Sequence, residues 1–334
     1  MIAVNHKYEL AARPVGYPKR SDWKYVEETV RDPGAGEVLI KIIYISLDPA
    51  MRGWINEGKS YVPPVAIGEV MRAMALGRVV ASNNPAFAPG DYVRGVLGVQ
   101  EYATTDGKGL MKVDPAIVPL SVYLGVLGMT GMTAYFGLLD VGQPKPGDTV
   151  VVSAAAGATG MVVGQIAKIK GCRAVGIAGG AEKCGYIVKE LGFDAAIDYK
   201  SEDVRKALQT HCPKGINIYF DNVGGEILDI ALSQLARGAR VAICGAISQY
   251  NNTTPIKGPS NYLSLLINRA SMKGFLVFDY ADRYADAGRE MAGWMAAGKL
   301  KSRDEFVEGI ENFPEALLKL FKGENIGKLM LKVG

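Results

Sequence analysis

Residues 149–170 read TVVVSAAAGATGMVVGQIAKIK, and this stretch decides the fold. Residues 149–156 are an apolar run typical of a buried strand, and residues 160–170 place their large apolar side chains on one helical face. The joining segment AAAGATG fits the Gly-x-Gly-x-x-Gly pattern of dinucleotide-binding folds, with Ala155, Gly157 and Gly160 at the three small-residue positions. The first position makes a tight turn, the second admits a pyrophosphate, and the third lets the helix pack against the strand.

This turn predicts a phosphate site at the start of the helix. The backbone N–H groups of Ala158, Thr159, Gly160 and Met161 would face the phosphate oxygens, aided by the positive end of the helix dipole. The alternative is a tight strand-helix connection in which the small residues serve packing alone. The segments that follow favour the dinucleotide site.

Five further strands follow this unit in the rhythm of a doubly wound sheet. They are expected at residues 173–178, 195–199, 216–221, 240–244 and 273–278, with helices at 182–191 and 226–235 among the connections. Strands that alternate with helices predict an α/β fold with a parallel, doubly wound sheet, which is a Rossmann domain.

The end of the second of these six strands indicates which dinucleotide binds. An NAD-binding chain usually has Asp or Glu there, about 20 residues beyond the turn, to bind the ribose hydroxyls. This chain has Gly179 at that point, followed by Lys183, and Tyr199 ends the third strand. An ammonium attracts a 2′-phosphate that a carboxylate would repel, so NADP is favoured over NAD. The alternative for Lys183 is a solvated lysine on the face of a helix.

Residues 1–120 have a different character from the segments after residue 149. Short β-branched runs at 37–47, 77–82 and 91–96 lie between turn-rich segments, which predicts a β-rich, barrel-like domain. Near the C-terminus, a helix is expected before the strand KLMLKV at 328–333, and this strand is expected to rejoin the β-rich domain. We therefore expect residues 1–125 and 306–334 to form that domain and residues 126–305 to form the NADP-binding domain.

Composition excludes several classes of protein. The 334 residues exceed what one hydrophobic core usually supports, so two domains are expected. The net charge of +4, with Lys and Arg dispersed, argues against a nucleic-acid-binding surface. The N-terminus lacks the apolar core of a signal peptide, and no apolar stretch is long enough for a transmembrane helix. Four scattered cysteines predict reduced thiols and a cytoplasmic location, and two histidines without ligand spacing predict no metal site.

Three further motifs go beyond a generic Rossmann domain. They are DNVGG at 221–225, CGAISQYN at 244–251 and GENIGK at 323–328. Together with SAAAGATG, with TAYFGLL at 133–139 and with LDPAMRG at 47–53, they make the chain resemble the medium-chain dehydrogenase/reductase superfamily. More narrowly, it resembles the zinc-independent branch of prostaglandin reductases, plant double-bond reductases and bacterial curcumin reductases.

The resemblance implies a fold and an activity. The β-rich domain would be GroES-like and would carry the substrate and catalytic functions, with the substrate cleft between it and the Rossmann domain. The activity would be NADPH-dependent reduction of the carbon–carbon double bond of α,β-unsaturated ketones and aldehydes, and the protein would be a homodimer.

The resemblance also implies roles for individual residues. Lys183 and Tyr199 would hold the 2′-phosphate, and Asn222 would line the cofactor groove. The nicotinamide half would lie beside Cys244, Gly245, Ile247, Ser248 and Tyr250, and beside Phe275, Leu276 and Val277. Asn325 would contact the nicotinamide end, although the pattern around Gly327 by itself favours a turn asparagine.

Two positions depart from the pattern of this branch. Ala50 stands where the branch commonly has tyrosine, which puts the substrate preference of the branch in doubt for this chain. Thr130 stands where the branch has proline in a Gly-Met-Pro-Gly motif. Both changes could alter the substrate pocket without touching the NADP groove.

The expected chemistry assigns one catalytic residue. Hydride transfer to the β-carbon of an enone leaves negative charge on the carbonyl oxygen, which needs a donor. Tyr250 is the candidate donor, because it follows the fifth strand at the carboxyl edge of the sheet, where ligands bind. The alternatives are an aromatic wall of the pocket or a core tyrosine.

Two other functions compete with enone reduction. A quinone reductase of the same superfamily would use the same cofactor on another acceptor. A nucleotide-binding protein with little catalysis, acting in redox sensing, is the alternative from another class. A zinc alcohol dehydrogenase is disfavoured by the two histidines.

Overall fold

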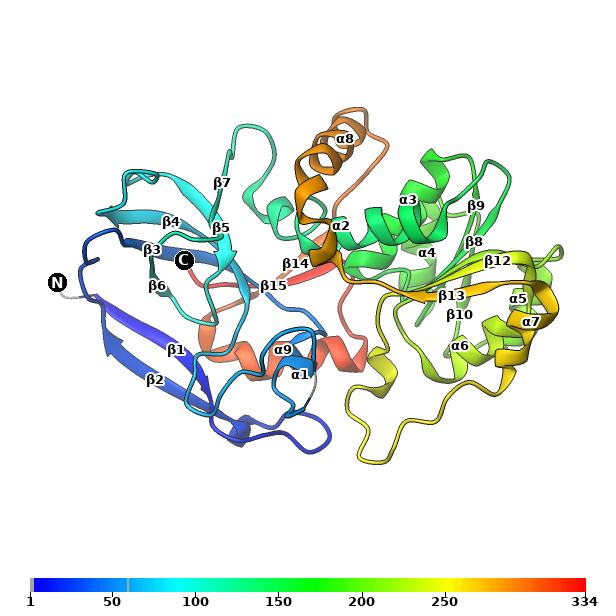
Figure 1. Ribbon diagram of the computed structural model, residues 1–334, viewed down its shortest axis with the longest axis horizontal. Helices are drawn as coiled ribbons and strands as arrows, with labels where there is room; N and C mark the ends of the chain where they lie inside the picture. Colours follow the sequence, from blue (N-terminus) through cyan, green and yellow to red (C-terminus); the bar gives the residue numbers. More distant parts are fainter. Residues whose placement is uncertain (1–2, 59) are drawn as a thin grey trace. The chain divides into compact units, whose positions relative to one another are not determined.

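The computed structural model describes residues 3–58 and 60–334, and the chain divides into two compact units (Figure 1). Unit 1 comprises Met1–Leu124 together with Asp304–Gly334, and unit 2 comprises Gly125–Arg303. The chain therefore leaves unit 1 once and returns to it for its last segment. Each unit has a hydrophobic core of its own.

Unit 1 is built mainly of β-strands. Its strands are β1 (Val4–Leu10), β2 (Trp23–Thr29), β3 (Val38–Ser46), β4 (Met74–Ser82), β5 (Tyr92–Val96), β6 (Tyr102–Thr105), β7 (Met111–Val113), β14 (Asp304–Glu308) and β15 (Lys328–Lys332), and its helices are α1 (Met51–Trp54) and α9 (Phe313–Lys322). β1 and β2 form an antiparallel hairpin. The other strands form a sheet in the order β14-β15-β3-β4-β5-β7, with β6 on β3. The predicted β-rich domain is confirmed.

β3 is the centre of this sheet, because β4, β6 and β15 all pair with it. Its apolar side chains Ile40, Ile42 and Ile45 are fully buried and belong to the hydrophobic core of unit 1. β15 pairs antiparallel with β3, with Met330 opposite Ser46. The C-terminal strand thus rejoins the β-rich unit, as the sequence predicts.

Unit 2 alternates strands and helices. Its strands are β8 (Thr149–Ser153), β9 (Arg173–Ala178), β10 (Ala195–Asp198), β11 (Ile216–Asp221), β12 (Leu235–Ile243) and β13 (Ser271–Gly274), and its helices are α2 (Met129–Phe136), α3 (Ala158–Ile169), α4 (Ala181–Lys189), α5 (Val204–His211), α6 (Gly225–Leu232), α7 (Ser264–Asn268) and α8 (Tyr284–Ala296). The strands form a six-stranded sheet in the order β10-β9-β8-β11-β12-β13, and every neighbouring pair is parallel.

This strand order is that of the Rossmann fold. The chain winds from β8 outward to β9 and β10, then crosses back to β11 on the other side of β8 (Figure 1). The crevice at the carboxyl ends of β8 and β11, where the winding reverses, is the usual ligand site of such sheets. The predicted doubly wound α/β fold is therefore confirmed.

Several element boundaries differ from the sequence prediction, most of all around β12 and β13. The apolar run KGFLVF predicts a strand over 273–278, but β13 ends at Gly274 and a 3₁₀ segment begins at Val277. A short apolar run by itself does not distinguish a strand from a buried turn. The helix predicted at 226–235 ends at Leu232, and β12 begins at Leu235. The Ser233 hydroxyl donates to the carbonyl of Ile230, so it competes with continuation of the helix.

Candidate functional site

β8 leads into α3 through a turn at residues 154–157. Ala154 has a φ of +49°, which costs an L-residue roughly 1–2 kcal/mol, and its carbonyl accepts the N–H of Gly157 at 2.9 Å. The sequence pattern predicts the tight turn at Ala155, but the structure places it one residue earlier, and Ala155 is fully buried. A Cβ on Gly160 would lie 2.3 Å from the carbonyl oxygen of Ala154, so α3 can pack this closely only with glycine there.

The first turn of α3 presents unused hydrogen-bond donors. The helix begins after Gly157, whose N-cap position supplies no side-chain acceptor. The N–H groups of Ala158, Thr159 and Gly160 have no acceptor among residues 3–58 and 60–334. The sequence predicts that the N–H of Met161 also faces the phosphate. In the structure this N–H donates to the carbonyl of Gly157 and is therefore already used. Three free donors at the positive end of a helix fit a pyrophosphate.

The carboxyl ends of β9 and β10 bring together two of the predicted cofactor-binding residues, Gly179 and Tyr199. A Cβ on Gly179 would lie 2.8–2.9 Å from the ring and hydroxyl of Tyr199, so the phenol rests directly against that glycine. Tyr199 is 43% exposed, which leaves it accessible to a ligand. Lys183 is the third residue of α4, which begins after Gly180. A phenol and an ammonium here provide the donors that a phosphate requires.

Asp198 stands beside these residues and is absent from the sequence prediction. Its Oδ1 accepts the N–H of Gly180 at 2.7 Å and that of Lys200 at 3.0 Å, and its Oδ2 accepts the hydroxyl of Ser201 at 2.9 Å. The hydrogen bond from Gly180 is the main cause that lowers the pKa of Asp198. An Asp that bonds the backbone two residues on is a known turn motif, so the run Asp-Tyr-Lys-Ser was the available sequence signal.

A buried polar network joins the carboxyl ends of β8 and β11. The Asp221 carboxylate accepts the hydroxyl of Ser153 at 3.0 Å and that of Tyr219 at 3.2 Å, besides the N–H groups of Val223 and Gly224, both at 3.1 Å. Burial raises the pKa of Asp221, and these donors oppose the rise. Four donors on one buried carboxylate fix the start of the DNVGG loop.

Asn222 is held by the same strand end. Its N–H donates to the hydroxyl of Ser153 at 2.8 Å, and its side-chain Nδ2 donates to the carbonyl of Ser153 at 2.7 Å. The side chain therefore orients the loop at the switch point between β8 and β11. Its predicted role as a wall of the cofactor groove stays a prediction.

The loop after β12 is tied to the DNVGG loop, so the structure brings these two predicted segments together. The N–H groups of Cys244 and Gly245 both donate to the carbonyl of Asp221, at 2.9 and 3.1 Å. The N–H of Ile247 donates to the carbonyl of Asn222 at 3.2 Å. Burial raises the pKa of the Cys244 thiol to about 12, which keeps it protonated at neutral pH.

Ser248 and Tyr250 make local contacts in this loop. The Ser248 hydroxyl donates to the carbonyl of Val223 at 2.6 Å. The Tyr250 hydroxyl accepts the N–H of Ala246 at 3.1 Å, and a Cβ on Gly245 would lie 2.8 Å from that oxygen. The phenol of Tyr250 thus also braces its own loop.

The segment after β13 does not continue the strand, and its first residue packs against a strand of the sheet. The Phe275 ring packs against that of Phe220 on β11, with ring centroids 6.1 Å apart. A Cβ on Gly137 would lie 2.2 Å from the Phe275 ring, so the π-helical segment Gly137–Gly142, which follows α2, can approach this ring only with glycine at its first position. Leu276 is half-buried and Val277 is buried, beyond the end of β13.

Thr130, at the start of α2, uses its hydroxyl on the turn that precedes the helix. Its Oγ1 donates to the carbonyl of Gly125 at 3.0 Å. The N–H of Thr130 has no acceptor within the described part of the chain, as is usual in the first turn of a helix.

Thr130→Pro is therefore expected to change the free energy of unfolding by less than about 1 kcal/mol, because the ring removes one hydroxyl hydrogen bond and no backbone bond. Urea unfolding of this variant, with Thr130→Val as the control that removes the hydroxyl alone, measures the effect. A loss of more than about 3 kcal/mol, the cost of proline inside a helix, would show that Thr130 is not a first-turn position.

Two of the predicted positions lie in unit 1. The Asn325 side-chain Nδ2 donates to the carbonyl of Gly327 at 2.9 Å, which is the turn geometry that the local pattern favours. Ala50 stands at the start of α1, is half-buried and packs against the core of unit 1. The contact of Asn325 with a nicotinamide stays a prediction.

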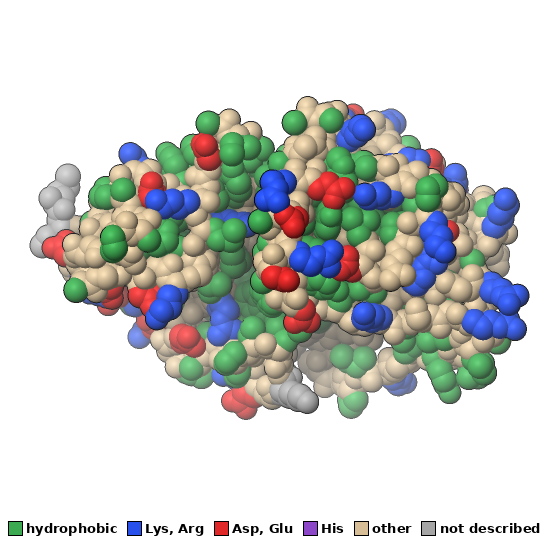
Figure 2. Space-filling model, turned by 45° about the horizontal axis from the view of Figure 1, so that its top comes forward, with side chains coloured by type: hydrophobic (Ala, Val, Ile, Leu, Met, Phe, Trp, Pro, Cys, Tyr) green, Lys and Arg blue, Asp and Glu red, His purple; other side chains and the backbone are tan. Residues whose placement is uncertain are grey.

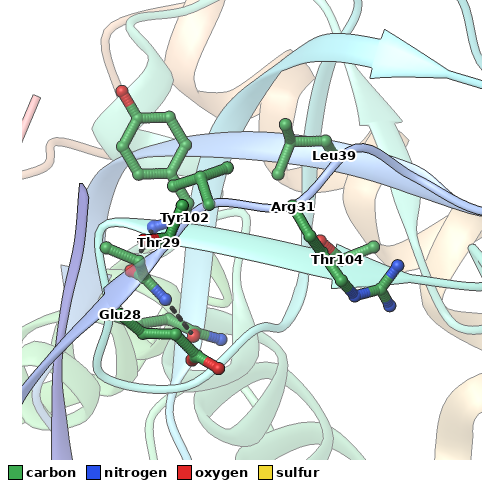
Figure 3. Close-up of a pocket in the computed structure, with 9 residues that line it drawn as sticks. Glu28, Thr29, Arg31, Leu39, Tyr102 and Thr104 are labelled. Atoms are coloured by element: carbon green, nitrogen blue, oxygen red, sulfur yellow. Dashed lines mark hydrogen bonds between the residues drawn. The ribbon is translucent and has the colours of Figure 1, made fainter. Parts of the chain in front are cut away.

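A polar cavity of about 260 Å³ also lies in unit 1, on the side of β2, β3 and β6 (Figure 3). Asn5 is among its lining residues, and its Nδ2 donates to Gln100 while its Oδ1 accepts the N–H groups of Glu101 and Tyr102. The Arg31 guanidinium at its rim is paired with Glu37. None of the predicted site residues lines this cavity.

The described residues contain no group of three or more His, Cys, Asp or Glu side chains that could hold a metal ion. All four cysteines are free thiols. Across residues 3–58 and 60–334, no helix is long and apolar enough to span a membrane. On the face drawn in Figure 2, Lys and Arg are mixed with Asp and Glu, so no basic stripe forms there.

The doubly wound sheet, the phosphate turn and the separate β-rich unit define a two-domain, dinucleotide-binding oxidoreductase. The family described as "N-terminal domain of oxidoreductase" matches residues 6–113, and the family described as "Zinc-binding dehydrogenase" matches residues 158–293. The chain belongs to the medium-chain dehydrogenase/reductase superfamily, in the branch of the curcumin, 2-alkenal and prostaglandin reductases.

Two relatives and one solved structure match almost the whole chain. The protein YfmJ of Bacillus subtilis is 48% identical, over 100% of this chain and 99% of YfmJ. The NADPH-dependent curcumin reductase of Escherichia coli is 44% identical, over 98% of this chain and 97% of that enzyme. The crystal structure of CurA from Vibrio vulnificus in complex with NADPH is 45% identical with a TM-score of 0.93, over 98% of this chain and 99% of CurA.

Proposed function

We propose that this protein is an NADPH-dependent reductase of the carbon–carbon double bond of α,β-unsaturated ketones and aldehydes. The observation that carries the proposal is the 44% identity to an NADPH-dependent curcumin reductase through both units, so that the cofactor unit and the β-rich unit match together. A match confined to unit 2 would have supported dinucleotide binding alone.

The described residues of unit 2 fit the proposed cofactor. The N–H groups of Ala158, Thr159 and Gly160 would bind the pyrophosphate, because they are unused donors at the start of α3. Lys183 and the Tyr199 phenol beside Gly179 would bind the 2′-phosphate. The loop at 244–250 would lie beside the nicotinamide half of the cofactor. Bound NADPH would supply the hydride.

Tyr250 is the proposed donor to the oxygen on which negative charge develops. Its hydroxyl oxygen already accepts the N–H of Ala246, and that hydrogen bond makes the phenol a better donor by polarising it. The same bond fixes the ring against Gly245, which would hold the donor in place before the reaction.

Tyr250→Phe is expected to lower kcat by about 100-fold, the usual effect of removing one donor to a developing oxyanion. The Kd for NADPH is expected to change by less than about threefold, because the ring remains in place. Stopped-flow reduction of a small enone, together with fluorescence titration of NADPH, separates the two quantities. An unchanged kcat would show that the Tyr250 hydroxyl does not act as the donor and only stabilises its own loop.

The proposed activity is tested by following NADPH oxidation with a panel of enals, enones and quinones, with NADH as the control cofactor. Turnover of enals and enones with NADPH, and much slower turnover with NADH, is the expected result. Faster turnover of quinones would make the protein a quinone reductase. NADPH binding without oxidation across the whole panel would leave a nucleotide-binding protein.

The protein is further proposed to act as a homodimer in the cytoplasm. β13 is the edge of its sheet and all four of its residues are exposed, although the strands of parallel sheets are normally covered (Figure 1). The neighbouring helix α7 exposes Leu266 by 76% and Ile267 by 67%. An open strand edge beside exposed apolar side chains suits a second copy of the same surface, and sedimentation velocity of the purified protein tests it. The free thiols suit a reducing compartment.

A further inference from the structure

The Asp198 carboxylate joins three segments at the carboxyl ends of β9 and β10. Its Oδ1 receives two backbone N–H groups, from Gly180 at 2.7 Å and from Lys200 at 3.0 Å. Its Oδ2 receives the hydroxyl of Ser201 at 2.9 Å. All three donors come from the turns that follow these two strands, so one side chain couples the turn after β9 to the turn after β10.

The turn after β9 depends on that coupling. Gly180 is the N-cap residue of α4 and has a φ of +95°, a conformation that only glycine adopts readily. No side chain of α4 itself caps the helix, so the hydrogen bond from Gly180 to Asp198 fixes where the helix starts. Lys183 lies in the first turn of α4, and its position therefore follows from that start.

The turn after β10 carries Tyr199, the other residue proposed to bind the 2′-phosphate. The N–H of Tyr199 donates to the carbonyl of Ala178 at 3.1 Å, and the Tyr199 ring rests against Gly179. Tyr199 lies between Asp198 and Lys200 in the chain, and the N–H of Lys200 donates to the Asp198 carboxylate. The carboxylate thus holds the backbone at Gly180, where the helix that carries Lys183 begins, and at Lys200, next to Tyr199.

The bonds of Asp198 also explain how a carboxylate can stand beside a phosphate site. In an NAD-binding chain, an acid in this region binds the ribose hydroxyls and would repel a 2′-phosphate. Here its oxygens are engaged by Gly180, Lys200 and Ser201, and donors on a carboxylate spread and offset its charge.

We propose that Asp198 is the positioning residue of the 2′-phosphate pocket and thereby determines the preference for NADPH over NADH. It acts through the backbone of Gly180 and Lys200 and does not touch the phosphate. The inference rests on the proposed NADPH dependence and extends it to a residue outside the set that would contact the cofactor.

Two substitutions separate the hydrogen bonds of Asp198 from its charge. Asp198→Ala removes all three bonds, whereas Asp198→Asn keeps an oxygen for the N–H groups of Gly180 and Lys200 and can donate its amide to Ser201. Ser201→Ala is the matched control, because it removes one hydroxyl and leaves both backbone bonds intact.

Isothermal titration with NADPH, NADH and adenosine 2′,5′-bisphosphate supplies the measurement. Asp198→Ala is expected to weaken NADPH and the bisphosphate by about tenfold or more, with NADH changed by less than about threefold. Asp198→Asn is expected to bind NADPH as tightly as the wild type or more tightly, because a like charge is removed. Ser201→Ala is expected to stay within about threefold of the wild type for all three ligands.

Two results would overturn the inference. One is an Asp198→Ala variant that keeps wild-type affinity for NADPH. The other is an equal loss of NADPH and NADH, which indicates general damage to the Rossmann unit. A wild type without preference for NADPH would instead overturn the proposed function, and the wild-type titrations reveal that before any variant is compared.

Discussion

Lys328→Met is expected to lower the free energy of unfolding by about 3–5 kcal/mol, the usual cost of breaking a buried ion pair by removing one partner. The side chains of Lys328 and Asp48 are 1% and 5% exposed. Lys328 Nζ donates to Asp48 Oδ1 at 2.7 Å and to the carbonyl of Leu47 at 2.8 Å. Without the ammonium, the hydroxyl of Ser46, which donates to Oδ2, is the one partner that the Asp48 carboxylate keeps among the described residues.

The same pair allows a second variant that tests the cause. In the double variant Asp48→Leu with Lys328→Met, both charges are replaced by apolar groups, and stability is expected to recover by several kcal/mol, since such exchanges are often neutral. Urea unfolding followed by circular dichroism measures all three proteins. A double variant no more stable than Lys328→Met would show that packing, and not the orphaned charge, caused the loss.

β15 also offers a matched control for this prediction. Lys332 lies on the same strand and pairs with Glu308 at 3.1 Å, but the two side chains are 42% and 71% exposed. Exposed pairs contribute less than about 1 kcal/mol, so Lys332→Met is expected to be nearly neutral. A similar loss for Lys328→Met and Lys332→Met would contradict the role of burial.

The Rossmann sheet can be predicted from the sequence because most of its strands and helices can be recognised from short runs of neighbouring residues. The strands β8 to β12 contain short apolar runs, helices connect them, and the direction of winding follows from the general handedness of such units. Strand β14 was missed for the opposite reason. Residues 304–308 read DEFVE, half-exposed and charged, and they become a strand only because β15 pairs alongside them. Such pairing over a distance leaves no local pattern.

In the candidate site, too, single residues whose roles depend on the folded chain could not be predicted from local sequence patterns. The sequence pattern identifies the phosphate turn, but it does not reveal that Ala154 and not Ala155 has the positive φ. Asp198 and Asp221 were missed because each has a donor that is distant in the sequence, namely the N–H of Gly180 for Asp198 and the hydroxyl of Ser153 for Asp221, which only the folded chain brings near. The exception is Asn325, where the local turn pattern matches the hydrogen bond that the structure contains.

Gly160→Ala and Gly157→Ala are expected to separate the packing role of the phosphate turn from its binding role. A Cβ on Gly160 would lie 2.3 Å from the carbonyl oxygen of Ala154 and 2.8 Å from the Cα of Ala155, both of them backbone atoms. The start of α3 must therefore move, at a cost of about 2–3 kcal/mol of stability. Its three free N–H groups would move with it, so the Kd for NADPH is expected to rise by 100-fold or more, about 2.7 kcal/mol.

Gly157→Ala adds the same methyl group at a different place. A Cβ there would meet only the carbonyl oxygen of Ala154, at 3.2 Å, and the φ of Gly157 is −83°, which any residue adopts. Stability is expected to stay within about 1 kcal/mol of the wild type. The methyl would nevertheless stand where the pyrophosphate approaches the backbone, so the Kd for NADPH is expected to rise by about tenfold or more.

Thermal unfolding and NADPH titration of the two variants provide the comparison. Loss of both stability and binding in Gly160→Ala, with loss of binding alone in Gly157→Ala, is the expected pattern. Wild-type affinity in Gly157→Ala would place the pyrophosphate away from this turn, even if the protein still reduced enones. A stable Gly160→Ala variant would mean that α3 can lie farther from Ala154 than the structure has it. The two glycines differ in what surrounds their Cα atoms, and their variants therefore report separately on the fold and on the cofactor.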